Sequence, residues 1–547
     1  MNLPERAADA PTPLSPPRHP PSRRSDIPAS RRSRRVKLLA FFGFFLLCAG
    51  WALAAPYDGT PDEAQHIVRA AGVVRGEVAP TPLAADLGTG AFQDVPESLV
   101  RDNCWYFQPK VSAACAKAPG GGEQIVRTPT RAGRYNPVYY AVVGWPLAFW
   151  PTWTGVLLAR LISAALAAAF FAAAANSAIA WTRHRIMAAG VLAAVTPMAV
   201  HLTGAVNPNS LEIAAGTALF AALVPTLLDP EAPLRRAAMV QVGLAGGTLM
   251  TLRALGPLWC LSIIGILLLP IAGTRLRSVL SSRATRWSLV ALAMTGIAGV
   301  AWTILMKTAE LGSLPGKTPT HWTVAQTVRY IAVDRWPAYV NQMIGVLSWL
   351  DTTLPSTAYV LWELALGCLL LLAVAFGTWT DRWRLFAISA VTFGVPTLSD
   401  ALNVNKYGLV SQGRYMLPIA VGLPILAAFV IGRRGVLDES RSKALTRTFA
   451  VLLMPLQMAF LCYTMVRWQS GLGNSIRHLP LDPLAGDWHP PVGSLAALLT
   501  AGAGCAALVA WTWMGTSTSA GTGAGLRLDP DGEPTPTTMN MLSRSLV

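Results

Sequence analysis

Apolar segments long enough to cross a lipid bilayer recur along the whole chain, and this feature constrains the fold more than any other. Hydrophobic residues make up 53% of the 547 residues, and charged residues only 13%. A helix needs about 20 apolar residues to cross the hydrocarbon core, and only helices and closed barrels satisfy their backbone hydrogen bonds there. The sequence therefore predicts an all-α membrane protein with many spans.

The formal net charge of +16 does not indicate a nucleic-acid partner. Lys and Arg are concentrated in the N-terminal segment, as in Arg31–Lys37, and in short loops between apolar segments. Such basic loops face the cytoplasm in membrane proteins. We therefore expect a multi-pass protein of the plasma membrane with both termini in the cytoplasm.

The alternation of basic loops predicts about twelve spans. The transmembrane domain is expected to cover residues 38–515, between disordered tails at 1–37 and 516–547. The apolar segment 136–150 is expected to lie at the outer surface, because a crossing there would place every later basic loop outside.

The first expected span, at about 38–55, has a second interpretation. Its triplet Ala52-Leu53-Ala54 resembles the cleavage site of a signal peptide. The long N-terminal segment and the length of the apolar segment favour a membrane anchor that is retained.

Two segments between spans are expected outside, a first outer loop at 56–152 and a second outer segment at 307–357. The first opens with Tyr57–His66, in which Thr60 could cap a helix, Pro61 could occupy its first position and Glu63 could complete a capping box. This pattern predicts a helix at the water-facing edge of the membrane.

Asp62, Glu63 and His66 on this helix allow two interpretations. The two carboxylates could only stabilise the helix N-terminus. They could also act as a general base on a hydroxyl, or bind a divalent cation such as Mg or Mn. In this catalytic interpretation Asp62 is the base, and Glu63 and His66 orient the acceptor or help to hold the cation. His66 follows Asp62 by one turn, so we expect it to be a partner of Asp62 rather than a metal ligand.

Other polar residues lie near the expected outer ends of spans. Arg253 and Arg414 could bind a phosphate bidentately, or could anchor the chain at the interface or form internal salt bridges. Because Asp62 and both arginines lie at the same expected depth, we predict that Asp62 approaches Arg253 or Arg414 in the folded protein. Arg160 and Glu212 lie within apolar segments, and we expect them to pair with each other. The remaining candidates for substrate binding are Gln412, Tyr415, Asn207, Asn209, Asp351 and Arg134.

Cys104 and Cys115 both lie in the first outer loop, where an oxidising environment permits a disulfide. We predict that they are joined, the alternative being two free thiols. No Cys/His spacing typical of a metal site appears.

The order of five motifs resembles that of a family of predicted bacterial membrane proteins of unknown function, which in turn resembles the GT-C glycosyltransferases. The motifs are Pro61-Asp62-Glu63 with His66, Asn136-Pro137-Val138-Tyr139-Tyr140, Asn207-Pro208-Asn209, Trp349-Leu350-Asp351 with Leu354-Pro355, and Gln412-Gly413-Arg414-Tyr415 with Pro418. The resemblance covers about 38–515. This chain departs from the family's pattern at Asn136-Pro137, where many members of the family have two prolines.

The GT-C resemblance implies a multi-span bundle with juxtamembrane helices in its first outer loop. It also implies transfer of a sugar from a polyprenyl-phosphate donor on the outer face, with an acidic residue or pair in that loop as base or metal site. The matching positions are Asp62 and Glu63. The expected partners are this donor, membrane lipid and an envelope glycan or glycolipid as acceptor.

Two alternatives to an inverting glycosyltransferase remain. A transporter or flippase of lipid-linked sugars would need a midplane site, broken helices and repeat symmetry, and the sequence has no visible repeat. A non-catalytic partner in envelope assembly would keep the fold without the reaction, and a substitution at Asp62 would distinguish it from an enzyme.

Overall fold

The computed structural model describes most of the chain, over residues 29–80, 90–122, 124–182, 185–308, 321–473 and 482–517. Of the tails predicted to be disordered, residues 1–28 and 518–547 lie outside these ranges. Residues 29–37 instead form the first turns of α1 (Ala29–Ala54). The predicted N-terminal tail therefore overlaps α1 at residues 29–37.

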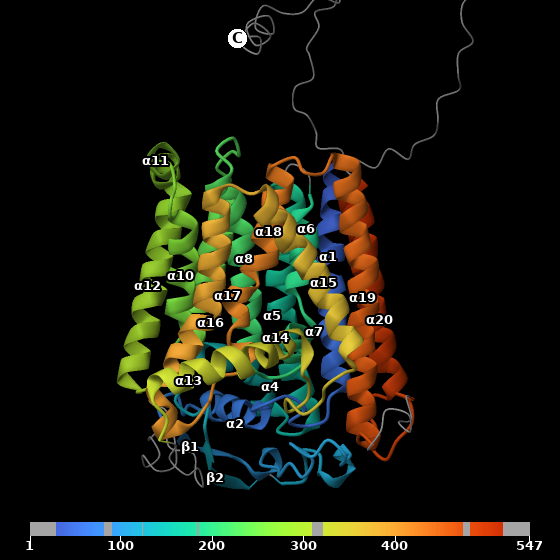
Figure 1. Ribbon diagram of the computed structural model, residues 1–547. Helices are drawn as coiled ribbons and strands as arrows, with labels where there is room; N and C mark the ends of the chain where they lie inside the picture. The colour runs from blue at the N-terminus through green and yellow to red at the C-terminus, as the bar shows by residue number, and fades with distance from the viewer. Residues whose placement is uncertain are drawn as a thin grey trace, which may run out of the picture.

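The long helices run side by side in an upright bundle, with short helices and two strands gathered at one end (Figure 1). We call the end that carries residues 56–152 the loop end. α1 packs antiparallel to α20 (Ser494–Ser517), because Gly43 approaches Leu508 while Gly50 approaches Ala501. Both ends of the described chain therefore lie at the same end of the bundle, opposite the loop end.

Eight helices of the described residues are long and apolar enough to cross a membrane. They are α1, α5 (Trp153–Ala180), α8 (Pro208–Leu228), α12 (Arg283–Leu305), α15 (Ser356–Phe376), α16 (Trp379–Tyr407), α19 (Glu439–Ser470) and α20. The chain is thus a multi-pass helical membrane protein.

The other four expected spans correspond to helices that are short or interrupted. They are α6 (Met187–Ala194) with α7 (Pro197–Thr203), α9 (Arg236–Leu252), α10 (Gly256–Leu268), and α17 (Leu417–Ala420) with α18 (Gly422–Arg433). A helix as short as α10 reaches only about 20 Å, less than the roughly 30 Å of a bilayer core. The count of twelve spans remains a prediction.

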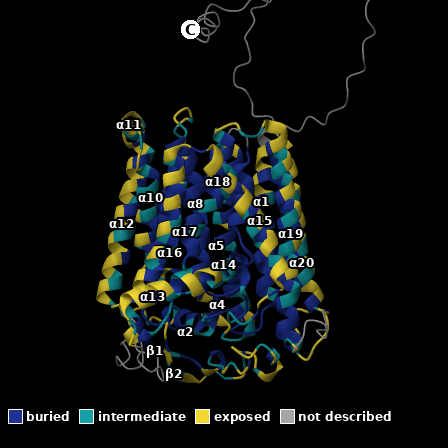
Figure 2. Ribbon diagram, in the orientation of Figure 1, coloured by how far each residue is buried: buried dark blue, intermediate teal, exposed yellow. Residues whose placement is uncertain are grey.

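Burial separates the central helices from the peripheral ones (Figure 2). Every residue of α8 is buried, whereas α12 exposes large apolar side chains such as Ile297 and Leu305. A helix that is apolar all round is expected in the interior of a bundle, and an exposed apolar face is expected to contact lipid.

The first outer loop contains the expected juxtamembrane helices and an unexpected sheet. Its helices are α2 (Glu63–Val74), α3 (Pro137–Val143) and α4 (Trp145–Phe149). β1 (Ala91–Pro96) pairs antiparallel with β2 (Ile125–Thr130), a small two-stranded sheet beside an otherwise helical fold of the described residues, as the all-α prediction expects. α3 and α4 have seven and five residues and are too short to cross a bilayer, in agreement with the surface position expected for 136–150.

The second outer segment also lies along the loop end. It contains α13 (Val324–Tyr330), a π-helical turn (Ile331–Arg335) and α14 (Trp336–Gly345). These elements run across the long helices rather than along them (Figure 1). Residues 309–320 of the predicted segment lie outside the described residues.

The first testable prediction concerns which end of the bundle faces the cytoplasm. The α11 helix (Gly273–Ser281) lies opposite the loop end (Figure 1), and its basic residues should keep it in the cytoplasm. In a background without the free cysteines, we expect an impermeant maleimide on intact cells to label Arg131→Cys beside β2 but not Arg277→Cys on α11. Labelling of position 277 with protection of position 131 would show the opposite orientation.

Candidate active site

Two aspartates shape the turn that leads into α2. Asp58 and Asp62 both have left-handed backbone conformations, with φ of 60° and 69°, which are uncommon for residues other than glycine. The helix begins at Glu63, and its second N–H, on Ala64, is capped by Asp58 Oδ1 at 2.9 Å. The predicted capping box with Thr60 is therefore wrong, because the tight turn brings Asp58 to the helix start instead.

Sequence reasoning missed Asp58. Its other carboxylate oxygen accepts a hydrogen bond from Asn103 Nδ2 at 2.9 Å. Burial raises the pKa of this carboxyl well above its ordinary value. The Asp58-Gly59 pair is a turn signal and could have indicated that this aspartate, and not Thr60, sets the start of the helix.

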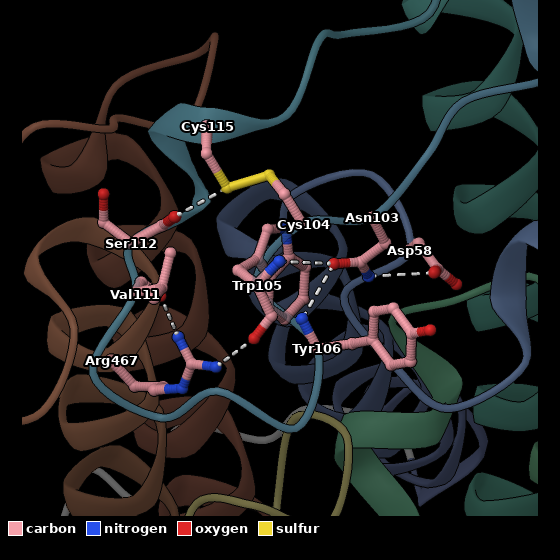
Figure 3. Close-up of a disulfide and its surroundings, with 9 residues drawn as sticks. All are labelled: Asp58, Asn103, Cys104, Trp105, Tyr106, Val111, Ser112, Cys115 and Arg467. Atoms are coloured by element: carbon pink, nitrogen blue, oxygen red, sulfur yellow. Dashed lines mark hydrogen bonds between the residues drawn. A yellow bond between two sulfur atoms is a disulfide. The ribbon is translucent and has the colours of Figure 1, made fainter.

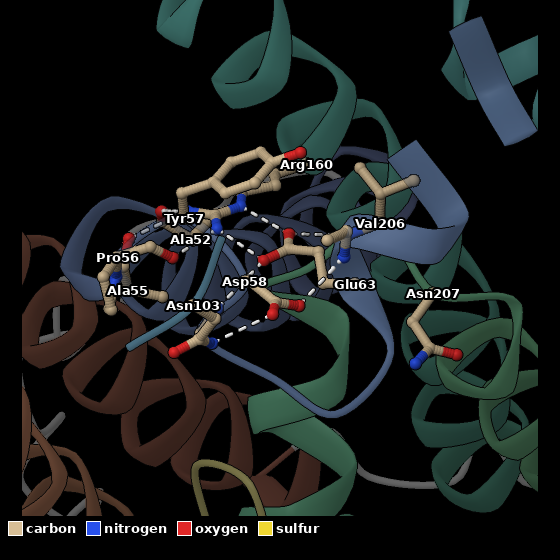
Figure 4. A network of polar contacts seen from close by, with 12 residues as sticks. Ala52, Ala55, Pro56, Tyr57, Asp58, Glu63, Asn103, Arg160, Val206 and Asn207 are labelled. Atoms are coloured by element: carbon tan, nitrogen blue, oxygen red, sulfur yellow. Dashed lines mark hydrogen bonds and ion pairs between the residues drawn. The ribbon is translucent and has the colours of Figure 1, made fainter. Parts of the chain in front are cut away.

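Glu63 is held by Arg160 of α5 in a fully buried ion pair (Figure 4). Arg160 donates from Nε to Oε1 at 2.7 Å and from Nη2 to Oε2 at 2.6 Å. The backbone N–H groups of Gly59 and Val206 donate to the remaining positions of the carboxylate, each at 3.2 Å. Glu63 thus accepts four hydrogen bonds, the usual capacity of a carboxylate.

This geometry corrects two expectations. A carboxylate with four donors has no position left for a divalent cation or for a substrate proton, so the expected roles of Glu63 do not fit. Arg160 also pairs with Glu63 and not with Glu212. Its remaining N–H groups donate to the carbonyl oxygens of Ala52, Ala55 and Pro56, which joins the end of α1 to the start of α2.

Asp62 points away from this pair and contacts Arg414. Its Oδ2 lies 2.5 Å from Arg414 Nη2, which confirms the prediction that Asp62 approaches an arginine distant in sequence. Arg414 also donates to the carbonyl oxygen of Pro61 and to Gln412 Oε1. The carboxylate is 35% exposed and the guanidinium side chain only 2%, so solvent reaches the pair from the side of Asp62.

Arg253 completes the cluster from the end of α9. It donates to Glu212 at 3.2 Å, and its guanidinium lies 4.7 Å from the ring centre of Tyr415 and 5.7 Å from that of Tyr135. Arg414 lies 4.8 Å from the same Tyr415 ring. Tyr415 therefore contacts both arginines, and cation–π attraction stabilises them beside each other.

The two asparagines of the Asn207-Pro208-Asn209 motif hold these elements together. Asn207 caps α8 by accepting from the Asn209 N–H, and it donates to the carbonyl oxygen of Pro61. Asn209 donates to Glu212 and to the carbonyl oxygen of Arg414. The motif thus joins the start of α8 to the turns that carry Asp62 and Arg414.

Two other predicted binding residues have different partners. Asp351 pairs with Arg467 of α19 at 2.9 Å, and that arginine also donates to the carbonyl oxygens of Trp105 and Val111 (Figure 3). Arg134 donates to the carbonyl oxygen of Met306 at 3.4 Å. These contacts hold the outer segments on the bundle, so we assign neither residue to the cluster.

His66 is buried, and its Nδ1 and the Tyr140 hydroxyl share a hydrogen bond of 2.8 Å. The expected pairing with Asp62 is therefore replaced by a contact with α3. Burial lowers the pKa of His66 to about 3, against an opposing effect of the Asp62 charge. The imidazole is neutral at physiological pH.

A pH-dependent stability follows for His66. Because its folded pKa is below the unfolded value of 6.5, the stabilisation is complete above pH 6.5 and is lost as the pH falls toward 3. Between pH 7.5 and 5 we expect a loss of about 2 kcal/mol, measured as the free energy of unfolding by SDS titration in mixed micelles. His66→Gln should reduce this pH dependence, and an unchanged slope would contradict the assignment.

The carboxylate of Asp62 is ionised at neutral pH. Burial raises its pKa, but the charge and hydrogen bond of Arg414 outweigh this effect, so the pKa is lower than usual. Over the described ranges, no group of three or more His, Cys, Asp or Glu side chains could hold a metal ion. The cluster therefore offers one partly exposed carboxylate beside two guanidinium groups, an arrangement that can accept a proton and bind an anion.

Comparison with known proteins gives a family. A family model described as a predicted membrane protein, DUF2142, matches residues 45–423. This range is more than half of the chain and contains Asp62, Glu212, Arg253 and Arg414. A search of curated proteins gave no match. The chain therefore belongs to the DUF2142 family of predicted membrane proteins.

Proposed function

We propose that this protein is a membrane glycosyltransferase, which moves a sugar from a polyprenyl-phosphate donor to an envelope glycan or glycolipid on the outer face. The contact between Asp62 and Arg414 carries the proposal. It places an exposed carboxylate, able to act as a base, within one hydrogen bond of a cation that suits phosphate. The two groups that a single displacement needs are then close to one reacting carbon.

The reaction is a single displacement at the anomeric carbon. The acceptor hydroxyl gives its proton to the Asp62 carboxylate while its oxygen forms a bond to that carbon. The bond between the carbon and the phosphate oxygen breaks, and its electron pair leaves with the polyprenyl phosphate. Arg253 and Arg414 stabilise the charge that grows on this phosphate, and attack from the opposite side inverts the anomeric centre.

The ion pair explains how donor binding could activate the base. With Arg414 as its partner, Asp62 is a weak base. A donor phosphate that takes over the Nη2 group of Arg414 removes part of this stabilisation and raises the pKa of Asp62. The side chains of Asp62 and Arg253 are 35% and 20% exposed, so a phosphate can approach both from the solvent.

The remaining residues hold these groups in position. Glu63 and Arg160 fix the turn before α2, and Asn207 and Asn209 fix the turns of Asp62 and Arg414. A Mg or Mn ion would find only Asp62 as a ligand from the predicted acidic pair, together with oxygens of the donor phosphate.

The position of the cluster favours an enzyme over a transporter of lipid-linked sugars. Asp62 follows α1, Arg253 follows α9, and Arg414 precedes α17. These are helix ends, whereas transporters place their sites near the bilayer midplane. The interruptions between α6 and α7 and between α17 and α18 are features that a transporter would share, so the test must distinguish the two.

Proteoliposomes that contain a polyprenyl-phosphate sugar, radiolabelled in the sugar, provide this test. The protein is expected to transfer the label to added envelope glycans. Arg253→Gln should raise the KM for the donor about 10- to 100-fold, since a charged hydrogen bond contributes roughly 1.5–3 kcal/mol. Arg277→Gln on α11 is the control and should change nothing. Movement of the intact donor between leaflets without transfer would show a transporter.

A further inference from the structure

Three aromatic side chains form a patch on the outer segments, which we call the aromatic platform. Tyr106 and Phe107 come from the first outer loop and Trp349 from the second outer segment. The ring centres lie 5.2 Å apart for Tyr106 and Trp349, and 5.5 Å apart for Phe107 and Trp349. Tyr106 is 44% and Phe107 61% exposed, so a large aromatic surface faces the solvent.

Three sets of contacts fix the loop that carries Tyr106 (Figure 3). The predicted disulfide between Cys104 and Cys115 is present. Asn103 Oδ1 accepts hydrogen bonds from the N–H groups of Trp105 and Tyr106. Arg467 donates to the carbonyl oxygen of Trp105. The aromatic rings are therefore presented by a fixed loop and not by a freely moving one.

The backbone at the platform is strained. Phe107 has a φ of 57°, and the two neighbours of Trp349, Ser348 and Leu350, have φ of 53° and 58°. Bulky L-residues rarely adopt this left-handed conformation, and such strain persists where the surrounding structure enforces it, often at functional sites. The fold thus keeps an unfavourable backbone on both segments that bring the rings together.

The platform is linked directly to the turn of the candidate active site. Trp349 Nε1 donates to the carbonyl oxygen of Asp58 at 2.8 Å, and Asn103 donates to the carboxylate of the same residue. Asp62 follows four residues later. Four residues span at most roughly 15 Å between Cα atoms, so the platform lies within reach of a chain bound at Asp62.

We propose that the aromatic platform binds sugar rings of the acceptor glycan and directs its hydroxyl toward Asp62. Aromatic faces carry partial negative charge and attract the polarised C–H groups of a pyranose. Exposed polar residues of the same loop, Asp102 and Gln108, can bond to the hydroxyl groups at its edge. The acceptor role rests on the proposed transferase function.

A second group of exposed aromatic residues differs from the aromatic platform in its backbone conformation and its position. Trp145, Phe149 and Trp150 lie at and just after α4 with exposures of 47%, 69% and 47%. None of the three has a left-handed backbone, and their position suits the aromatic belt at a membrane surface. Insertion into lipid requires no fixed ring geometry, so the strain at Phe107 favours a glycan over lipid as the ligand of the platform.

Photo-crosslinking captures whichever ligand contacts the platform in the cell. With p-benzoylphenylalanine in place of Phe107, irradiation of intact cells is expected to yield adducts whose mass identifies hexose or related sugar units. The same substitution at Phe149 should yield lipid adducts. Lipid or protein adducts at position 107, or no adduct there, would overturn the proposal.

Kinetics separate this proposal from the proposed function. Phe107→Ala should raise the KM for the acceptor about tenfold and leave kcat and the donor KM unchanged, with Phe149→Ala as the matched control. An unchanged acceptor KM would overturn the role of the platform even if transfer is real. Failure of the chemistry would instead appear at Asp62, and sugar adducts at position 107 would then show glycan binding without transfer.

Discussion

Asp62→Asn is expected to fold and insert normally but to lose at least 99% of sugar transfer. Asn has nearly the same shape, and its amide oxygen can still accept from Arg414, but it cannot take the acceptor proton. General-base catalysis contributes about 10²- to 10⁴-fold, so kcat should fall by at least about 100-fold. Arg414 keeps Pro61, Gln412 and the Tyr415 hydroxyl as hydrogen-bond partners, which limits the loss of stability.

The matched control is Asp26→Asn in the N-terminal segment, which should leave transfer unchanged. The pH profile gives a second readout. Because the pKa of Asp62 is below its usual value of 3.8, the base is present above that pH, and kcat/KM should not fall from its titration between pH 8 and 5. Near-full transfer by Asp62→Asn would contradict the catalytic assignment.

The meeting of Asp62, Arg253 and Arg414 could be predicted from sequence because all three lie at helix ends expected on the same side. The depth of a residue in a membrane protein follows from apolar segments and basic loops. The partners within that depth could not be predicted. One residue along a helix turns a side chain by about 100°, and this separates the exposed Asp62 from the buried Glu63.

Arg160 was wrongly predicted to pair with Glu212 for the same reason, because sequence indicates depth but not the partner at that depth. Glu63, Arg160, Glu212 and Arg253 all lie near the loop end, so several pairings satisfy the sequence equally well. Packing decides between them: Arg160 of α5 reaches Glu63 at the start of α2, while Glu212 lies beside Arg253. The strands β1 and β2 were missed for another reason: each has only six residues, too few for a clear alternating pattern.

The number of spans could not be derived from hydropathy alone. Hydropathy identified the apolar segments correctly, but not where helices break inside them. Pro197 begins α7 after the end of α6, and Pro418 lies in the short helix α17. Proline removes a backbone donor, and α6 ends before Pro197 while the hydropathy remains high. α17 and α18 are separated only by Val421, which keeps a helical conformation.

Glu63→Gln is expected to destabilise the protein strongly. It leaves the fully buried Arg160 without a countercharge, and breaking a buried ion pair by removing one partner costs about 3–5 kcal/mol. The free energy of unfolding, measured by SDS titration in mixed micelles, should fall by this amount. Arg160→Met should cost at least as much, because it also leaves the carbonyl oxygens of Ala52, Ala55 and Pro56 without their donor.

An exposed ion pair of the same chain provides the control. Lys443 and Glu439 pair one turn apart on the surface of α19, and Glu439→Gln should cost at most about 0.5 kcal/mol. If Glu63 instead acted as base or metal ligand, Glu63→Gln would abolish transfer while leaving stability near that of the control. A loss of both stability and membrane abundance is the result that the four-donor geometry predicts, because the carboxylate serves to fasten the turn that presents Asp62.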